Sequence, residues 1–453
     1  MTLERWICSL NLWIKNGHLL DPAAGCDQIC DLYVMDGTVA AVGSLPEDKK
    51  ELFFSGDVRE LDVAGKYVMP GFVDLHVHLR EPGFEYKETV RTGTMAAAKG
   101  GFTAVCPMPN TNPPTDCPER IRKVLEISEK DSPIHVYPVG AVTVGQLGKE
   151  ITDIDGMVKA GAKAISEDGR SVMNAGIYRM AMREAARLSI PVMAHCEDIN
   201  LVGGGAVNAG PQAEKLGIKG ITNAVEDVIV ARDILLAKET GAKLHLCHCS
   251  TKDSVDMIQR AKEEGLAVTG EVCPHHFTLT DEDILCDDAN YKMNPPLRSA
   301  TDVDRLRQGL ASGIMDAVST DHAPHSKEEK ERTIAEAPFG IVGSETAFSL
   351  AVTELVKTGI LSPMELVRKM STNPCAILGV EGGSLQTGMP ADITVADFEE
   401  KYVIDKNDFV SKGKNTPFHG REVYGTIAYT IVAGEVVYPF EGGKEQMDDK
   451  CFN

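Results

Sequence analysis

DLHVH, residues 74–78, follows the apolar run Tyr67 to Val73, which predicts a buried strand. Side chains alternate along a strand, so His76 and His78 are expected to point the same way. Two imidazoles that converge from one strand end suit a zinc ion, which binds nitrogen at ~2.0–2.1 Å. A chain with 12 histidines produces such pairs by chance, so the other strand ends must decide what this one means.

Seven further apolar runs, rich in Val, Ile and Ala, recur along the chain, and most end at a titratable or amide residue. The runs are Phe102 to Pro107, His135 to Gly140, Ala162 to Ile165, Ile190 to Ala194, Lys243 to Cys247, Leu266 to Glu271 and Met315 to Thr320. The residues that follow them include Asn110, Glu167, Asp168, His195, His248, His275, His276 and Asp321. Helical periodicity lies between the runs, as in Asn174 to Leu188 and Asp253 to Glu264. This alternation predicts an α/β fold, a (β/α)8 TIM-like barrel whose chemistry gathers at the carboxyl ends of its strands.

Both ends of the chain contain strand-like segments outside this barrel. They are Leu12 to Leu20, Asp31 to Val42, Ala391 to Asp397, Val423 to Val432 and Val436 to Tyr438, and Asp36-Gly37 predicts a type I′ hairpin turn. Neither set has enough strands to be stable alone, so we expect the two to pair in a small β-sandwich built from both termini. The predicted domains are 1–66 with 374–453 for the sandwich and 67–373 for the barrel, and residues 441–453 are expected to fray.

Charge and composition restrict the partners. A formal net charge of −21 argues against nucleic acid and against an anionic membrane, because the field of the protein repels polyanions. A small anionic substrate therefore needs a local positive site. The N-terminal residues lack a signal-peptide core and no run of 18 apolar residues occurs, so we expect a cytoplasmic protein. Twelve scattered cysteines without Cys-x-x-Cys favour reduced core thiols over disulfides.

Several longer motifs resemble those of dihydroorotases, members of the amidohydrolase superfamily. They are PGFVDLHVHLREPG (70–83), MPNTNPP (108–114), AHCED (194–198), CPHHF (273–277), MNPPLR (293–298), STDHAPH (319–325) and PFGIVGSE (338–345). The resemblance spans nearly the whole chain. HLREPG and MNPPLR point to dihydroorotase in particular, whereas the His-x-His pair is shared more widely.

The resemblance implies a set of metal ligands. His76 and His78 are implied to bind one zinc, and His195 and His248 a second. Asp168 resembles the aspartate that bridges the two metals in the long bacterial type of dihydroorotase. Asp321 resembles the metal-bound general base. Relatives with SDDG or TDDG have Asp where this chain has Glu167, a departure that leaves Asp168 itself intact.

The resemblance also implies substrate contacts. Arg80, Asn110 and His325 look like carboxylate-binding residues, Asn294 and the Phe339-Gly340 backbone like contacts to the pyrimidine ring, and His78 also lies beside the substrate. A guanidinium can hold a carboxylate bidentately, so Arg80 would supply the local positive site. The alternative for Arg80 is a salt bridge to Glu81 or Glu85.

The implied reaction is the zinc-dependent, reversible cyclisation of N-carbamoyl-L-aspartate to (S)-dihydroorotate, with loss of water, in de novo pyrimidine biosynthesis. Opening the ring near neutral pH requires a hydroxide, and bound zinc lowers the pKa of its water to ~7 while polarising the ring carbonyl. A carboxylate beside that water, Asp321, can accept its proton and pass it to the departing nitrogen.

Two other functions remain alternatives. A hydantoinase- or allantoinase-like cyclic amidase would share the fold and most ligands, but those relatives use a carbamylated lysine as the bridge. The nearest candidate, Lys163, lies five residues before Asp168, an odd offset that points it the opposite way in a regular strand. A non-catalytic scaffold of the same fold is the other alternative, although every ligand position here is filled.

Other marked residues are expected to have supporting roles. His275 and His276 are expected to hydrogen-bond around the ligands, His245 to pack on the other side of its strand, and KEEKER (327–332) to be a solvated stretch beside a lid. We expect a homodimer with two zinc ions per subunit, the second less firmly held. The number of metals as purified and docking on aspartate carbamoyltransferase, known in some relatives, stay open.

Overall fold

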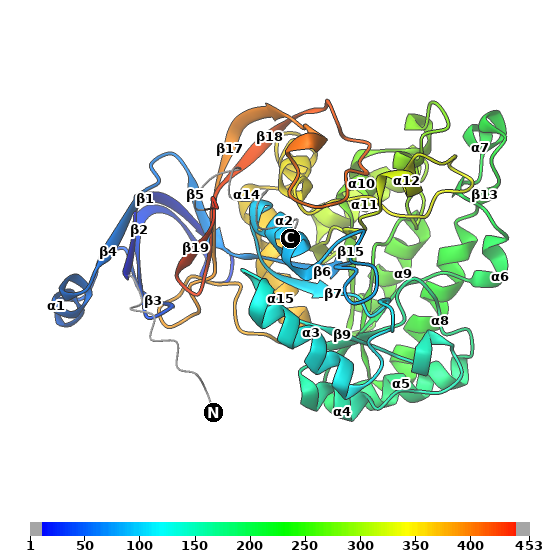
Figure 1. Cartoon of the computed structure of the whole chain (residues 1–453), viewed down its shortest axis with the longest axis horizontal. Coiled ribbons are helices and arrows are strands. Elements are labelled where there is room, and N and C mark those ends of the chain that lie inside the picture. The colour runs from blue at the N-terminus through cyan, green and yellow to red at the C-terminus, as the bar shows by residue number, and fades with distance from the viewer. Residues whose placement is uncertain (1–10, 441–453) are drawn as a thin grey trace.

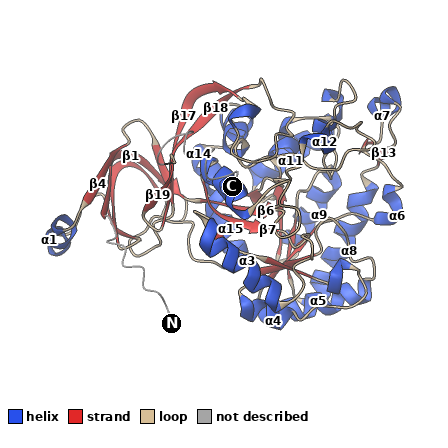
Figure 2. Ribbon diagram, viewed as in Figure 1, coloured by secondary structure: helices blue, strands red, loops and turns tan. Residues whose placement is uncertain are grey.

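The computed structural model describes residues 11–440, and its larger part is a barrel of parallel strands surrounded by helices (Figures 1 and 2). The strands are β6 (Phe72–Val77), β7 (Phe102–Pro107), β8 (His135–Val136), β9 (Val139–Ala141), β10 (Ala164–Ser166), β11 (Pro191–Ala194), β14 (Lys243–Leu246), β15 (Val268–Val272) and β16 (Ala317–Val318). Their ladders are all parallel. The predicted (β/α)8 barrel is confirmed.

Two irregular places complete the barrel. The third passage of the chain is interrupted at Pro138, which has no backbone N–H, so β8 pairs with β7 and β9 pairs with β10. The eighth passage meets the first through a parallel bridge between Val77 and His322. Beside this bridge the buried Asp74 carboxylate accepts hydrogen bonds from the amide and hydroxyl of Thr320, at 3.0 and 2.6 Å. The Asp74 side chain therefore supplies hydrogen bonds between the first and last barrel strands, where backbone pairing is limited to a short bridge.

The apolar run Tyr67 to Val73 is divided between two sheets, which differs from the single strand predicted. β5 (Tyr67–Pro70) pairs outside the barrel, whereas β6 begins at Phe72 and contains the first four residues of the DLHVH motif. Gly71 lies between them, and a Cβ atom there would overlap the Thr103 side chain. A glycine is thus required where the chain changes sheets, and His78 follows the carboxyl end of β6.

Helices cover the outside of the barrel. They are α2 (Val90–Lys99), α3 (Pro118–Asp131), α4 (Ile154–Ala160), α5 (Ala175–Leu188), α8 (Ala224–Thr240), α9 (Lys252–Glu263), α11 (Ala300–Ser312), and, after the last strand, α13 (Ala347–Ala351), α14 (Pro363–Val367) and α15 (Asn373–Leu378), with π-helical turns at Val352–Val356 and Arg368–Thr372. Asn174 caps α5 and Thr251 caps α9, each through its side-chain oxygen. These two helices match the predicted segments to within one residue.

Short elements occupy the loops that follow the strands. They are α6 (Ile199–Val202), β12 (Val207–Asn208), α7 (Pro211–Leu216), β13 (Gly220–Ile221), α10 (Pro274–Thr278) and α12 (Lys327–Lys330), with 3-10 turns at Val144–Gln146, Asp281–Asp283 and Ala289–Tyr291. All of them follow carboxyl ends of strands. They therefore surround the mouth at which the predicted site residues gather.

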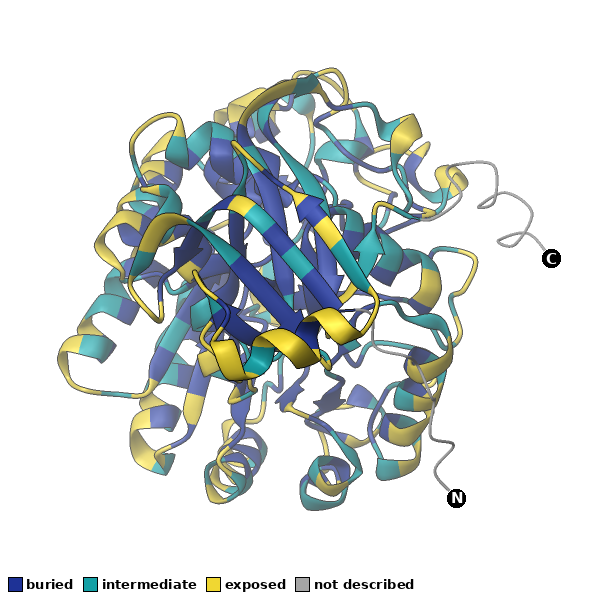
Figure 3. Cartoon of the chain, turned by 90° about the vertical axis from the view of Figure 1, so that its left-hand side faces the viewer, coloured by how far each residue is buried: buried dark blue, intermediate teal, exposed yellow. Residues whose placement is uncertain are grey.

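Strands from both ends of the chain form one eight-stranded terminal sheet, in the order β19-β18-β17-β5-β1-β2-β3, with β4 also pairing β1. Its other members are β1 (Asn11–Asp21), β2 (Cys26–Met35), β3 (Thr38–Val42), β4 (Val58–Asp62), β17 (Ile393–Val403), β18 (Glu422–Val432) and β19 (Glu435–Tyr438), and α1 (Glu47–Ser55) lies at one edge. Asp36 and Gly37 have φ values of 51° and 73°, as a type I′ turn requires. Buried residues run along the strands of this unit (Figure 3). The predicted pairing of the two termini is confirmed.

β5 belongs to the terminal sheet, although it begins at Tyr67, where the barrel domain was expected to start. The division at residues 66 and 374 remains our proposal. The expectation for 441–453 falls outside the described residues.

The cysteines in residues 11–440 are all free, and most are buried. Within the same range, no helix combines the length and the apolar character that crossing a bilayer demands.

Candidate active site

The six side chains predicted to bind metal meet at the carboxyl ends of five barrel strands. They are His76 and His78 from β6, Asp168 after β10, His195 after β11, His248 after β14 and Asp321 after β16. Each is less than a tenth exposed. Parallel strands bring residues hundreds of positions apart to one edge, which is how the fold assembles this group.

One part of the group is formed by the histidines of β6 with two carboxylates. His76 Nε2 lies 3.1 Å from Asp168 Oδ1 and 3.6 Å from Asp321 Oδ1. His78 Nε2 lies 3.0 Å from Asp321 Oδ1 and 3.6 Å from Asp168 Oδ2. Potential ligand atoms from four side chains thus surround one small volume.

The other part contains the histidines that follow β11 and β14. His195 Nδ1 lies 2.9 Å from His248 Nε2, and these two atoms lie 3.6 and 3.8 Å from Asp168 Oδ1. The Asp168 carboxylate is therefore shared by both pairs of histidines. This is the arrangement that a residue bridging two metal ions must have.

The donor set fits zinc. Ligands ~2.0–2.1 Å from a tetrahedral zinc lie roughly 3.3 Å from one another, close to the 2.9–3.8 Å separations observed. Both ring nitrogens of His76 and Nδ1 of His248 are buried and lack a hydrogen-bond partner in residues 11–440. A buried polar atom left unpaired costs ~1–3 kcal/mol, and coordination removes that cost at His76 Nε2. Imidazole and carboxylate together are typical zinc ligands.

Electrostatics keep both carboxylates ionised. Burial alone would raise the pKa of Asp168, but the nearby imidazoles of His76, His248 and His78 hold that pKa well below the ordinary value. The pKa of Asp321 is lowered in the same way, against the effect of burial, chiefly by His78 and His76. Ionised carboxylates are the form that binds metal and accepts protons.

Three site residues have left-handed backbone conformations. The φ values are 60° at Arg80, 35° at His248 and 49° at Asp321. Such conformations cost of order 1–3 kcal/mol for residues other than glycine and collect where a side chain must be aimed. They turn these side chains into the mouth at the points where the strands end.

Asn110, from the loop after β7, connects two of the metal-binding residues. Its Oδ1 lies 3.0 Å from His78 Nδ1, and its Nδ2 donates to Asp168 Oδ2 at 3.0 Å. The first contact fixes the His78 tautomer with a proton on Nδ1, which leaves Nε2 free to bind metal. One N–H of the amide stays available for the carboxylate contact predicted from the sequence.

Arg80 and His325 form a basic patch beside the ligands. Arg80 Nε donates to the Pro324 carbonyl at 3.2 Å, and its Nη2 lies 3.3 Å from His325 Nε2. Burial, followed by the charges of Arg80 and Lys87, lowers the pKa of His325, so this ring is neutral. The ring donates from Nε2 to the Phe339 carbonyl at 2.8 Å.

The salt-bridge alternative for Arg80 is not supported. The Glu81 carboxylate accepts a hydrogen bond from the Val90 amide at 2.9 Å, and that of Glu85 accepts one from the Gly83 amide at 2.7 Å. Neither is paired with Arg80 in the described part of the chain. The guanidinium therefore keeps N–H groups for an anionic ligand.

Asn294 and the Phe339-Gly340 segment lie near each other at the mouth, and the Phe339 carbonyl borders the Arg80 and His325 pair. Asn294 Nδ2 donates to Glu197 Oε1 at 2.9 Å, and Glu197 Oε2 lies 3.4 Å from His195 Nε2. The amide of Gly340 donates to the Lys292 carbonyl at 3.0 Å. Glu197 was not singled out from the sequence, although it lies within the AHCED motif.

Glu271, at the end of β15, is a further residue that the sequence analysis missed. Its Oε1 lies 3.3 Å from His76 Nδ1 and accepts the His248 amide at 3.1 Å, and its Oε2 lies 3.0 Å from His245 Nε2. It is fully buried. A carboxylate inside a run of apolar residues was the available signal. His245 is buried as predicted, and its partner is Glu271.

Lys163, the candidate for a carbamylated lysine, is exposed at the start of β10 and takes no part in the site. The neighbouring Glu167 also points elsewhere, because it accepts hydrogen bonds from the amide of Thr143, at 3.0 Å, and from its hydroxyl. His276 Nε2 lies 3.0 Å from the Pro295 carbonyl, in agreement with its predicted supporting role.

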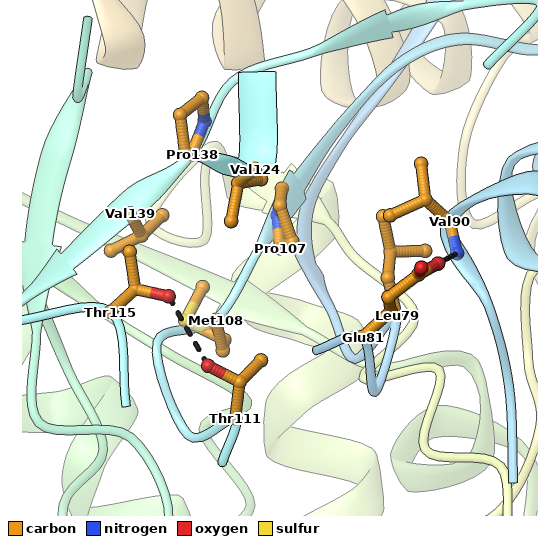
Figure 4. A pocket seen from close by; sticks show the side chains of 10 residues that line it. All are labelled: Leu79, Glu81, Val90, Pro107, Met108, Thr111, Thr115, Val124, Pro138 and Val139. Carbon is orange, nitrogen blue, oxygen red and sulfur yellow. Dashed lines mark hydrogen bonds between the residues drawn. The ribbon is translucent and has the colours of Figure 1, made fainter. Parts of the chain in front are cut away.

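Figure 4 shows a pocket behind the two loops that carry Arg80 and Asn110. It is lined by their immediate neighbours and by residues of the surrounding helices and strands, namely Leu79, Glu81, Val90, Pro107, Met108, Thr111, Thr115, Val124, Pro138 and Val139. A hydrogen bond of 3.2 Å joins the hydroxyls of Thr111 and Thr115. The largely apolar lining indicates packing that supports the loops from behind.

Comparisons with known proteins agree with this geometry. A family model described as "Dihydro-orotase-like" matches residues 65–254. A protein named dihydroorotase from Pelotomaculum thermopropionicum is 48% identical over 428 residues, covering 94% of this chain and 98% of its own. Another of that name, from Caldanaerobacter subterraneus, is 47% identical over 429 residues, covering 95% and 97%. The solved structure of L-hydantoinase (dihydropyrimidinase) from Arthrobacter aurescens has a TM-score of 0.84 at 28% identity, covering 94% of this chain and 96% of its own.

Proposed function

Because the chain belongs to the dihydroorotase family, we propose that it interconverts N-carbamoyl-L-aspartate and (S)-dihydroorotate with two zinc ions in each subunit. The observation that carries this proposal is the position of Asp168 between the two pairs of histidines, because its Oδ1 lies 3.1 Å from His76 Nε2 and 3.6 Å from His195 Nδ1. A basic patch for an anionic substrate lies beside that centre. This combination suits the opening and closing of a cyclic amide that bears a carboxylate.

The metal ligands in this proposal are His76, His78, Asp168, His195, His248 and Asp321. When bound, zinc supplies a nucleophile from water at neutral pH and polarises the carbonyl under attack. Asp168 holds the two ligand groups together, and Asn110 fixes the ring of His78. Glu271 restrains the ring of His76 from behind.

The proton in this scheme is carried by Asp321. Its carboxylate is ionised and lies 3.0 Å from His78 Nε2, at the centre of the ligand group. In ring opening it accepts the proton of the attacking water and delivers it to the departing ring nitrogen. In ring closure the same carboxylate accepts a proton from the attacking nitrogen and delivers it to the departing oxygen.

In the proposed complex, charge and the direction of hydrogen bonds determine how the substrate is recognised. Arg80 binds the substrate carboxylate through its free guanidinium N–H groups, with Asn110 and His325 on either side. Asn294 and the backbone at Phe339 and Gly340 contact the ring. The single N–H of the neutral His325 ring donates to the Phe339 carbonyl in the structure, so His325 would contact the carboxylate by exchanging that hydrogen bond when substrate binds. The local positive site that the net charge of −21 demands is thus Arg80 with Lys87 nearby.

Turnover of (S)-dihydroorotate and of hydantoin, measured on the same preparation together with its zinc content, tests the proposal. We expect turnover of dihydroorotate and close to two zinc ions per chain. Preferential turnover of hydantoin would overturn the assignment in favour of a hydantoinase, which the exposure of Lys163 already disfavours. No turnover by zinc-loaded protein would favour the scaffold alternative.

The proposal extends to a cytoplasmic homodimer. Size-exclusion chromatography with light scattering tests the dimer. The same measurement after addition of aspartate carbamoyltransferase decides whether the two enzymes associate.

A further inference from the structure

Lys330, at the end of α12, is a buried cation without a carboxylate partner within hydrogen-bond distance in residues 11–440. Its side chain is 8% exposed. The ammonium Nζ donates instead to three backbone carbonyls, those of Gly340 at 2.9 Å, Pro338 at 3.1 Å and Lys292 at 3.3 Å. The solvated character predicted for KEEKER is therefore wrong at this residue.

The three carbonyls belong to the part of the mouth that faces the ring in the proposed complex. Pro338 and Gly340 flank Phe339, and Lys292 lies two residues before Asn294. The Gly340 carbonyl also accepts a hydrogen bond from Asn415 Nδ2 at 3.0 Å, and the Phe339 carbonyl accepts one from His325. Lys330 thus links two sections of chain to α12, one at Lys292 and the other at Pro338 and Gly340.

We propose that Lys330 is a positioning residue for substrate recognition, one that sets the direction of the Phe339 N–H toward the pyrimidine ring. This inference rests on the proposed function. It concerns the backbone contact of the ring and is independent of the metal ligands.

The geometry of the peptide unit supplies the reason. In a trans peptide the carbonyl and the following N–H point in opposite directions within one plane. Lys330 binds the Pro338 carbonyl and so directs the Phe339 N–H away from the buried side. The neighbouring 339–340 peptide cannot swing to compensate, because its carbonyl accepts a hydrogen bond from His325 and its N–H donates to the Lys292 carbonyl.

The surroundings of Lys330 disfavour its charged form. Burial, followed by the charge of Lys292, lowers the pKa of Lys330 to about 7, while Asp288 and Glu329 act in the opposite sense. A buried ammonium persists where carbonyl oxygens replace its water. α12 itself is fastened across the mouth, because Glu329 pairs with Lys87 at 2.9 Å.

The test substitutes Lys330→Met, which keeps the length of the side chain and removes its donors, and compares it with Lys330→Gln, which retains a side-chain N–H. We measure kcat and KM for (S)-dihydroorotate, zinc content and thermal stability. Loss of one aligned hydrogen bond corresponds to a KM increase of roughly 5- to 10-fold. The expected result is that increase in Lys330→Met with kcat within about threefold and zinc unchanged, and a smaller increase in Lys330→Gln.

Lys369→Met is the matched control. Lys369 is also a buried lysine, 4% exposed, and its Nζ donates to the Met315 carbonyl at 2.7 Å, before β16 at the opposite end of the barrel. It should lower stability and leave KM unchanged. A KM within twofold of wild type in Lys330→Met, or an equal KM increase in Lys369→Met, overturns the inference. The proposed function fails separately, if the wild-type enzyme does not turn over dihydroorotate.

Discussion

In the proposed mechanism, Asp321 has two roles, to bind metal and to accept a proton. Asp321→Asn should keep zinc largely bound, because an amide oxygen can still contact the metal. It should lose turnover by several orders of magnitude, because a neutral amide cannot accept a proton. Steady-state kinetics with metal analysis check both outcomes. Near-normal activity in this variant would remove Asp321 from the role of general base.

Arg80 is the residue through which a protein of net charge −21 would hold an anion. Arg80→Met removes a charge-assisted contact worth ~1.5–3 kcal/mol, so KM for both substrates should rise roughly 10- to 150-fold. Zinc content should stay the same, since the side-chain hydrogen bonds of Arg80 involve the Pro324 carbonyl and His325, which are not among the proposed metal ligands. Arg91→Met, at an exposed arginine of α2, is the control and should leave KM unchanged. An unaltered KM in Arg80→Met would assign the guanidinium to loop packing alone.

At the scale of elements, the positions of two residues relative to β10 indicate which of them would bridge the proposed metals. Asp168 follows its carboxyl end, whereas Lys163 precedes its first residue and is exposed. Asp168→Ala should lose at least one zinc and most activity, because the second ion would keep only His195 and His248 as protein ligands. Lys163→Ala should retain both metals and activity.

Reconstitution of the apo-enzyme distinguishes the two bridges in another way. A carbamylated lysine forms from carbon dioxide, whereas an aspartate needs only the metal. Zinc alone should therefore restore full activity in bicarbonate-free buffer. Dependence on bicarbonate, or an inactive Lys163→Ala variant, would support the carbamylated bridge.

The elements that the sequence predicted best are those with a strong local period. Alternation along DLHVH is enough to place His76 and His78 on one side, and the caps of α5 and α9 lie where the helical periods begin. The division of Tyr67 to Val73 at Gly71 was not predictable in this way. An apolar run reports burial, but it does not report which of two sheets buries it.

The site residues that escaped prediction are those whose meaning depends on distant partners. Lys330 lies in a charged run, and its burial depends on carbonyls 8, 10 and 38 positions away in the chain. Glu271 gains its role from His76 and His245, which come from other strands. Motif resemblance predicted the metal ligands, but a single sequence contains no record of the contacts behind them.

At the scale of the whole molecule, Asp21 joins the two ends of the chain. Its buried carboxylate accepts hydrogen bonds from the amides of Ala23 and Ala24, at 2.9 and 3.0 Å, and from Ser384 Oγ and the Leu385 amide, at 2.9 and 2.6 Å. Asp21→Ala should lower the free energy of unfolding by about 2–3 kcal/mol, because charged hydrogen bonds are lost and buried donors are left unpaired.

Thermal and urea denaturation measure that effect, with KM and zinc content expected to stay the same. Asp27→Ala is the control from the same hairpin, since Asp27 is exposed and its one ion pair within residues 11–440 is with the ring of His18 at 2.6 Å. Equal stability of the two variants would show that the terminal sheet does not depend on this link.

The order of strands in the terminal sheet also determines when it can form during protein synthesis. β5 lies between β1 and β17 in the terminal sheet. Lys66, just before β5, pairs with Asp397 of β17, which lies 331 positions later in the chain. A ribosome that adds ~5–20 residues per second needs on the order of tens of seconds to make that stretch. The N-terminal strands therefore wait with an open edge while the barrel emerges and folds. Nascent chains of intermediate length are the forms of this protein that should most need a chaperone.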